Sequence, residues 1–153
     1  MTRCLRRLPF TAILFIVLLC LLLIPGSRGV LVAKELSSPD QAEIQTVIER
    51  QLGAFARDDA GTAFSIASPM IQRLFGTAAN FMAMVRAAYP QVYRHHRTEF
   101  GEMATVKGEW LQFVRFTGTD GHKALALYTM TKDAKGSWRI IGCRLLQRGE
   151  AGA

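Results

Sequence analysis

The sequence predicts an α+β domain in which N-terminal helices pack on a curved antiparallel sheet, preceded by a signal peptide. Three observations support this prediction. Residues 1–29 combine arginines with an apolar run, residues 38–89 carry helical patterns and capping residues, and residues 91–146 carry short β-rich runs separated by turns. Helices followed by strands, without a βαβ alternation, favour a helical layer on one face of a sheet.

The first 29 residues have the order of a secretory signal peptide. Arginines precede an unbroken apolar run over residues 10–24, and Ser27-Arg28-Gly29 supplies a small-x-small exit. The run is shorter than the roughly 20 residues that a membrane-spanning helix needs, so we favour cleavage over retention as an inner-membrane anchor. In both cases the domain is delivered outside the cytoplasm, as a periplasmic or secreted protein. We therefore divide the chain into a signal peptide (1–29), a linker (30–38), a single α+β domain (39–147) and a tail (148–153).

Charge and cysteine content narrow the possible partners. The chain has 19 basic and 12 acidic residues, a net charge of +7; four of the basic residues lie in residues 1–29, which leaves 15 against 12, or +3. Such a small and dispersed charge argues against a nucleic-acid partner. Two of the three cysteines also lie in residues 1–29, so Cys143 has no intramolecular disulfide partner. We interpret it as a small buried hydrophobe.

Capping residues mark the starts of three helices. Ser38 and Ser68 each stand before a proline, and Asp59 follows Asp58 at the start of a second helical pattern. The adjacent acids could act as a general acid and base, but a cap at Asp59 is the simpler interpretation. Apolar residues at i, i+3 and i+4 over residues 44–55 predict a long first helix with one buried face. We expect further helices around residues 63–66, from Met70 to Phe75, and over residues 81–88 before Pro90.

The pattern after Gln91 predicts an antiparallel meander. Turn residues separate the β-rich runs at 107–108, 118–121 and 133–136, and each turn contains a glycine where positive φ is expected. We place strands over residues 92–97, 100–106, 110–117, 123–131 and 138–146.

The order of these elements and several strings within it suggest a family. The strings are Ala54-Phe55, Asp58-Asp59-Ala60, Ala67-Ser68-Pro69, Phe75-Gly76 and Gly136-x-Trp138-Arg139-Ile140-x-Gly142-Cys143. Over about residues 40–147 they resemble a bacterial family described as a domain of unknown function (number 4864). That family is similar to the nuclear transport factor 2-like group, a cone-shaped α+β fold. The resemblance implies a pocket between the first helix and a bent sheet, but no particular reaction, because the group includes enzymes, binding modules and scaffolds.

The most polar cluster is Tyr93-Arg94-His95-His96-Arg97. On a strand, His95 would share a face with Tyr93 and Arg97, and His96 with Arg94. The two histidines could not easily bind one metal, and we predict no metal site. One face could recognise a carboxylate or phosphate through its arginines. We favour the alternative that this is a charged strand that resists edge-to-edge pairing.

Phenylalanine and methionine dominate the apolar residues of the domain. Flexible methionines suit either a pocket for an apolar ligand or an ordinary core. Our candidate pocket residues are Phe55, Phe64, Phe81, Met84, Trp110 and Tyr128.

We expect a non-catalytic role without a cofactor: binding of an apolar or amphipathic small molecule, or of a protein of the cell envelope. Contact with the membrane would be limited to an uncleaved N-terminal segment. A first alternative is an isomerase or dehydratase with a His or Asp in an apolar pocket, using His95 or His96 as base and Tyr93 or Tyr128 as hydrogen-bond donor. A second alternative is a homodimeric interaction module that associates through the open sheet face.

Overall fold

The computed structural model describes residues 38–146, except for the side chain of Ser38. The expected signal peptide (1–29), residues 30–37 of the linker and the tail (148–153) lie outside the described residues. The cap expected at Ser38 is likewise outside the description, although the first helix begins at this residue. None of the helices within residues 38–146 has the length and apolar character needed to cross a membrane.

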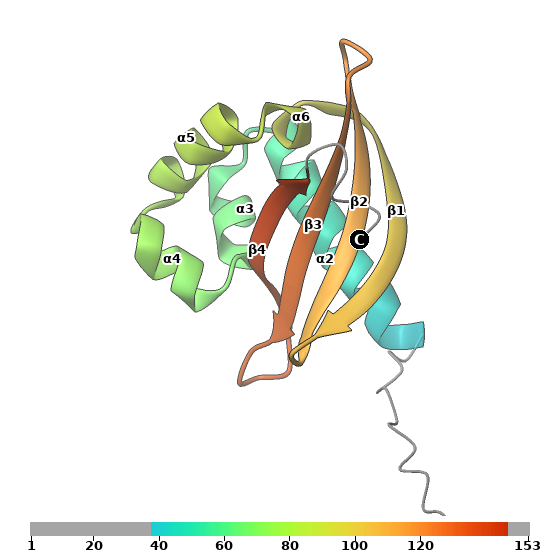
Figure 1. Cartoon of the computed structure of the whole chain (residues 1–153). Coiled ribbons are helices and arrows are strands. Elements are labelled where there is room, and N and C mark those ends of the chain that lie inside the picture. The colour runs from blue at the N-terminus through green and yellow to red at the C-terminus, as the bar shows by residue number, and fades with distance from the viewer. Residues whose placement is uncertain (1–37, 147–153) are drawn as a thin grey trace, which may run out of the picture. The chain divides into compact units, whose positions relative to one another are not determined.

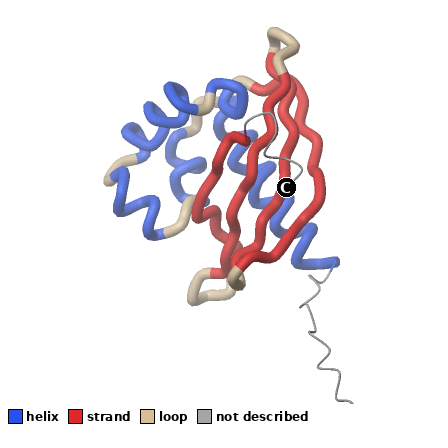
Figure 2. The backbone as a smooth tube through the Cα atoms, in the orientation of Figure 1, coloured by secondary structure: helices blue, strands red, loops and turns tan. Residues whose placement is uncertain are grey.

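Within residues 38–146, helices come first and strands follow, which confirms the predicted α+β fold. The strands form one antiparallel sheet in the order β1-β2-β3-β4. Helix α2 runs along one face of this sheet, and α3, α4 and α5 lie beside its β4 edge (Figures 1 and 2). The elements are α2 (Ser38–Ala56), α3 (Ala60–Ile66), α4 (Pro69–Phe75), α5 (Ala78–Ala88), α6 (Pro90–Tyr93), β1 (His95–Val106), β2 (Glu109–Gly118), β3 (Lys123–Lys132) and β4 (Trp138–Leu146).

The helix boundaries follow from local capping. The Asp59 carboxylate accepts a hydrogen bond from the Thr62 N–H at 2.9 Å, which confirms its predicted role as the N-cap of α3. Ser68 caps α4 in the same way, with its hydroxyl 3.4 Å from the Ile71 nitrogen. Gly76 ends α4 at a φ of 70°, a conformation that glycine adopts without steric cost.

The structure corrects the prediction for residues 92–97. They do not form a separate strand: Pro90 starts the short helix α6, and a single strand, β1, then runs from His95 to Val106. Proline is well suited to the first position of a helix, because it lacks the N–H that would have no partner there. The predicted strand alternation therefore fails, and Tyr93 and Arg94 do not share faces with His95 and His96 in the expected way.

The buried core lies between α2 and the inner face of the sheet. Ile44, Ile48, Leu52 and Phe55 of α2 are buried, as the apolar stripe predicted. They share one cluster with inward-facing strand residues, among them Val114, Phe116, Ala126, Tyr128, Met130 and Ile140.

The edge strand β4 is partly covered by the junction between α3 and α4. The Ser68 N–H donates a hydrogen bond to the Ile140 carbonyl at 2.8 Å, and Ala67 forms a parallel bridge with Ile140. This contact satisfies part of an otherwise open sheet edge. It also fixes the start of α4 beside the C-terminal half of the sheet.

Asp58 organises a polar cluster just after the C-terminal end of α2. Its φ of 58° is left-handed, and its carboxylate is bound by Arg86 at 3.1 Å and Arg94 at 3.0 Å. The Tyr93 hydroxyl also donates to this carboxylate, and both guanidinium groups lie over the Tyr93 ring. Hydrogen bonding from Arg94 is the largest of the effects that hold the pKa of Asp58 below its ordinary value. The cluster thus ties α5 and α6 to the turn between α2 and α3.

Replacing Asp59 tests the cap. Asp59→Ala should lower Tm by about 4 °C, because the first turn of α3 loses a hydrogen-bond acceptor. Asp59→Ser retains an acceptor and should preserve most of the stability. Thermal unfolding followed by circular dichroism at pH 7 measures both variants, and equal losses would contradict the cap.

Asp58→Asn tests the polar cluster. The pKa of Asp58 is lower in the fold than its ordinary value of 3.8, so its ionised form stabilises the fold above pH 3.8, and this contribution is lost as the pH falls through the folded pKa. Asparagine tolerates the left-handed backbone, so the variant removes mainly the charge. At low salt, the Tm of the wild type should fall more steeply than that of the variant between about pH 5 and pH 3. Parallel curves of Tm against pH would show that Asp58 contributes no such stabilisation.

Candidate ligand cavity

A cavity of about 270 Å³ lies between the helices and the C-terminal half of the sheet. Its walls come from α2, α4, α5 and α6 on one side and from β3 and β4 on the other. Most of the lining is apolar, which is typical of small-molecule sites. The apolar lining includes Phe55, Ile71, Phe75, Phe81, Met84, Val85, Val92 and Ile140.

Phe81 of α5 organises the aromatic part of the lining. Its ring centroid lies 6.3 Å from that of Phe55 and 5.6 Å from that of Phe75, with an edge-on arrangement in the second pair. Phe64 packs against Phe81 at 5.6 Å but does not line the cavity. Tilted and edge-on rings of this kind are the preferred aromatic geometries, so the wall has a defined shape.

Helix α4 forms the mouth of the cavity. It is rich in apolar residues, yet none of its residues is buried. Leu74 lines the cavity and is 76% exposed, whereas Met70 on the same helix is 58% exposed and does not line it. An exposed leucine that also lines an apolar cavity marks the point where a ligand could enter from solvent.

The polar groups of the cavity gather near β4. They belong to Gln51, Tyr89, Tyr128 and Cys143. The Tyr89 hydroxyl donates to the Cys143 carbonyl at 2.9 Å, and the Gln51 amide donates to the Ala63 carbonyl at 3.2 Å. The fully buried Tyr128 hydroxyl has no hydrogen-bond partner of normal geometry among the described residues.

Tyr89, Tyr128 and Cys143 are neutral near pH 7, and desolvation moves their pKa values still further from neutrality. Desolvation raises the pKa of Tyr128 well above its ordinary value and raises that of Tyr89 as well. Desolvation also raises the pKa of the Cys143 thiol to about 12. The thiol is therefore not a thiolate nucleophile under ordinary conditions.

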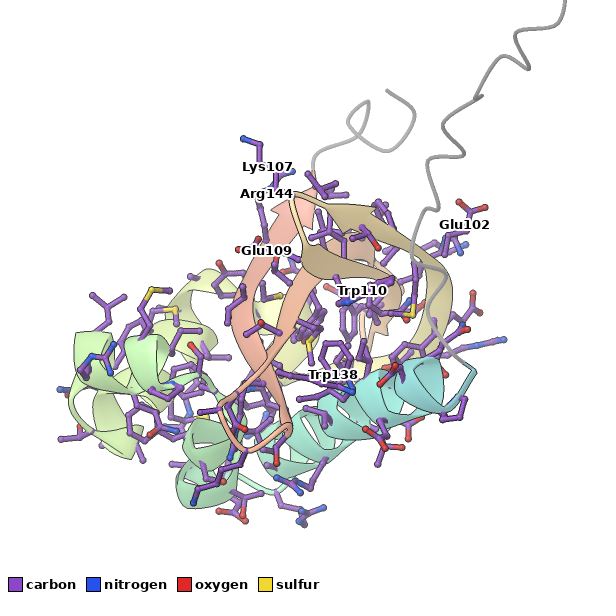
Figure 3. The ribbon with its side chains drawn as sticks, turned by 90° about the horizontal axis from the view of Figure 1, so that it is seen from below. Glu102, Lys107, Glu109, Trp110, Trp138 and Arg144 are labelled. Atoms are coloured by element: carbon purple, nitrogen blue, oxygen red, sulfur yellow. The ribbon has the colours of Figure 1, made fainter. Side chains whose placement is uncertain are left out.

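Four of the six candidate pocket residues line the cavity: Phe55, Phe81, Met84 and Tyr128. Phe64 and Trp110 do not. Trp110 packs against the core on the α2 side of the sheet, where Trp138 also lies (Figure 3). Sequence reasoning predicted the helix α4 but missed its contribution to the cavity, and it missed the polar residues Gln51, Tyr89 and Cys143. The spacing of Ile71, Leu74 and Phe75 at i, i+3 and i+4 is a signal that could have identified α4 as a cavity wall.

The predicted polar cluster 93–97 does not act as one surface. Tyr93 and Arg94 join Asp58, as described above. His95 is half-buried, with its Nδ1 2.8 Å from the Val92 carbonyl and its ring against Phe116. His96 is exposed, and Arg97 pairs with Glu99 at 3.0 Å.

The cavity offers no general base of the kind that the enzyme hypothesis requires. Neither His95 nor His96 lines it, and within residues 38–146 no carboxylate or imidazole does so. Asp59 is occupied as a helix cap and Asp58 as an ion-pair partner. Among the same described residues, no group of three or more His, Cys, Asp or Glu side chains could hold a metal ion.

Comparisons with known proteins place the chain in a family. A solved structure from Catenulispora acidiphila is 13% identical, covers 69% of this chain and 89% of its own, and superposes with a TM-score of 0.44. No curated protein matches the sequence. The model of the family described as a domain of unknown function (DUF4864) matches residues 37–153, well over half of the chain, as the sequence strings implied. The chain therefore belongs to the DUF4864 family.

Proposed function

We propose that this domain binds a small apolar or amphipathic molecule outside the cytoplasm and does not transform it. The observation that carries the proposal is the apolar cavity of about 270 Å³ with an exposed leucine at its mouth. Most of the cavity surface is hydrocarbon, so transfer of an apolar ligand from water is favourable. The few polar groups can orient a ligand without supplying acid–base chemistry near neutral pH.

The location outside the cytoplasm is part of the same proposal. It is supported by the basic and apolar order of residues 1–29, which suits export followed by cleavage. An inner-membrane anchor with the domain outside is the alternative. We also propose that the domain belongs with the nuclear transport factor 2-like group, because a long first helix lies against an antiparallel sheet with a cavity between helices and sheet.

Native mass spectrometry of protein recovered from cells that express the full chain is the direct test. We expect a small apolar molecule bound at a ratio of one to one, and a protein mass that lacks residues 1–29. A full-length mass in the membrane fraction would instead identify an uncleaved anchor. If the ligand is lost during purification, binding of an added apolar probe still tests whether the cavity is a binding site.

The neutral fluorescent probe 1-aminonaphthalene, with eleven non-hydrogen atoms, should bind the wild-type protein. Leu74→Asp should weaken binding about tenfold, because it replaces an apolar contact at the mouth with a carboxylate. Met70→Asp is the matched control on the same helix and should leave binding unchanged, since Met70 is exposed but does not line the cavity. Fluorescence titration measures all three proteins. No probe binding to the wild type, or equal weakening by the two variants, would overturn the cavity as the site.

Association into a homodimer that serves as an interaction module is the second candidate function. Apolar residues on the outer face of the sheet favour it. Leu111, Phe113, Leu125 and Leu127 alternate along their strands with buried core residues, and each keeps partial exposure. Phe113 and Leu127 are direct partners across β2 and β3. This apolar centre on an otherwise solvated sheet face suits a second copy of the chain.

Phe113→Glu tests the homodimer. If the wild type is a dimer by sedimentation velocity, this variant should be a monomer, because two buried carboxylates would face each other or apolar side chains. Val106→Glu is the control, since Val106 is 50% exposed at the end of β1 and away from the Phe113–Leu127 pair. A monomeric wild type would remove this candidate.

A further inference from the structure

The Tyr128 hydroxyl is a polar group that the fold itself does not explain. The Tyr128 side chain is fully buried, and its hydroxyl has no hydrogen-bond partner of normal geometry within residues 38–146. Buried hydroxyls are nearly always hydrogen-bonded, so one without a partner requires a reason. Its polar neighbour is the Cys143 thiol, and a thiol is only a weak acceptor.

Tyr128 belongs to the polar wall of the cavity. Tyr128 pairs with Cys143 across β3 and β4, and both residues line the cavity together with Tyr89. The Tyr89 hydroxyl already donates its hydrogen to the Cys143 carbonyl at 2.9 Å. Of the two tyrosine hydroxyls on this wall, that of Tyr128 is therefore the one whose hydrogen has no oxygen acceptor among the described residues.

The charge of the lining restricts the ligand further. Among the described residues, no lysine, arginine, histidine, aspartate or glutamate lines the cavity. A charged ligand group placed there would lose its hydration and gain no ion-pair partner, which is strongly unfavourable. A neutral ligand avoids this cost.

We propose that the cavity takes a neutral, largely hydrocarbon molecule with one hydrogen-bond acceptor, such as the carbonyl of a ketone or ester, and that the Tyr128 hydroxyl donates to that acceptor. This inference rests on the proposed function, because it names the class of molecule that the same cavity binds. A cavity of 150 Å³ holds benzene, so one of about 270 Å³ suits a molecule of roughly eleven to thirteen non-hydrogen atoms. The carbonyl would point toward β4, and the hydrocarbon would contact Phe55, Phe81 and Met84.

Three naphthalene derivatives of nearly equal size test the inference. 1-Acetylnaphthalene carries a carbonyl, 1-ethylnaphthalene lacks it, and 1-naphthoate carries a charge at pH 7. Their affinities are measured by displacement of 1-aminonaphthalene from protein recovered from cells that express the full chain. The wild type should bind the ketone roughly fivefold or more tightly than the hydrocarbon, as one added hydrogen bond implies. It should bind the carboxylate most weakly of the three.

Tyr128→Phe is the decisive variant, and Tyr89→Phe is its matched control. Tyr128→Phe should bind the ketone no more tightly than the hydrocarbon, because the carbonyl would then be buried without a donor, and the hydrocarbon affinity should be unchanged. It should unfold at a Tm no lower than that of the wild type, because it removes a buried hydroxyl without a partner. Tyr89→Phe should keep the preference for the ketone, since the Tyr89 hydroxyl is engaged by the Cys143 carbonyl.

The possible results distinguish a failure of the proposed Tyr128 hydrogen bond from a failure of the proposed binding function. Equal binding of ketone and hydrocarbon by the wild type, or a preference that survives in Tyr128→Phe, would overturn the role of the hydroxyl and leave the apolar site standing. Tight binding of 1-naphthoate would overturn the neutrality of the ligand. If none of the three ligands or the fluorescent probe binds the wild type, the proposed function itself fails.

Discussion

The packing of α2 on the sheet is the interaction on which the rest of this domain depends. With 19 residues α2 spans about 28 Å, and none of the other described helices exceeds 11 residues. Only α2 among them is long enough to cover strands of 9–12 residues along their length. The shorter helices must therefore find contacts beside it. Helices α3, α4 and α5 lie beside the β4 edge (Figure 1), where Gln51 binds the backbone of α3 and Ser68 binds that of β4. The cavity lies between α2, the shorter helices α4, α5 and α6, and the strands β3 and β4.

The polar wall of that cavity depends on an irregularity in β4. Met130 pairs with Ile140 and Thr129 pairs with Gly142, so Ile141 is an extra residue opposite the regular ladder of β3. A bulge of this kind reverses the alternation of side chains beyond it. Cys143 is thereby placed opposite Tyr128 on the inner face, instead of on the outer face that simple alternation would give. Tyr89 then reaches the backbone of the same residue from the end of α5.

Local sequence rules predicted much of the fold but only part of the cavity. The caps at Asp59 and Ser68 and the turn glycines depend on neighbouring residues, so their positions can be read along the chain. Residue type identified Phe81 and Met84 as cavity candidates, but it also selected Trp110, whose position in the core depends on sheet register. The β-rich pattern around Tyr93 predicts a strand, whereas its partner Asp58 lies 35 residues earlier, a contact that a local pattern does not contain. The bulge at Ile141 is likewise a property of strand pairing that periodicity does not contain.

The neutrality of the cavity also follows from how the fold distributes its charges. The guanidinium groups of Arg86 and Arg94 are half-exposed and bound to Asp58, and Arg139 is held by Asp133 at the β3–β4 turn. None of the residues in these ion pairs lines the cavity. The polar side chains that line it carry hydroxyl, thiol and amide groups. A phenylalanine at position 128 would occupy nearly the same space as the tyrosine without burying a hydroxyl, a burden of about 1–3 kcal/mol when the group has no partner. A ligand that supplies an acceptor removes this free-energy cost. The unpaired hydroxyl that destabilises the ligand-free protein would therefore favour the ligand-bound protein.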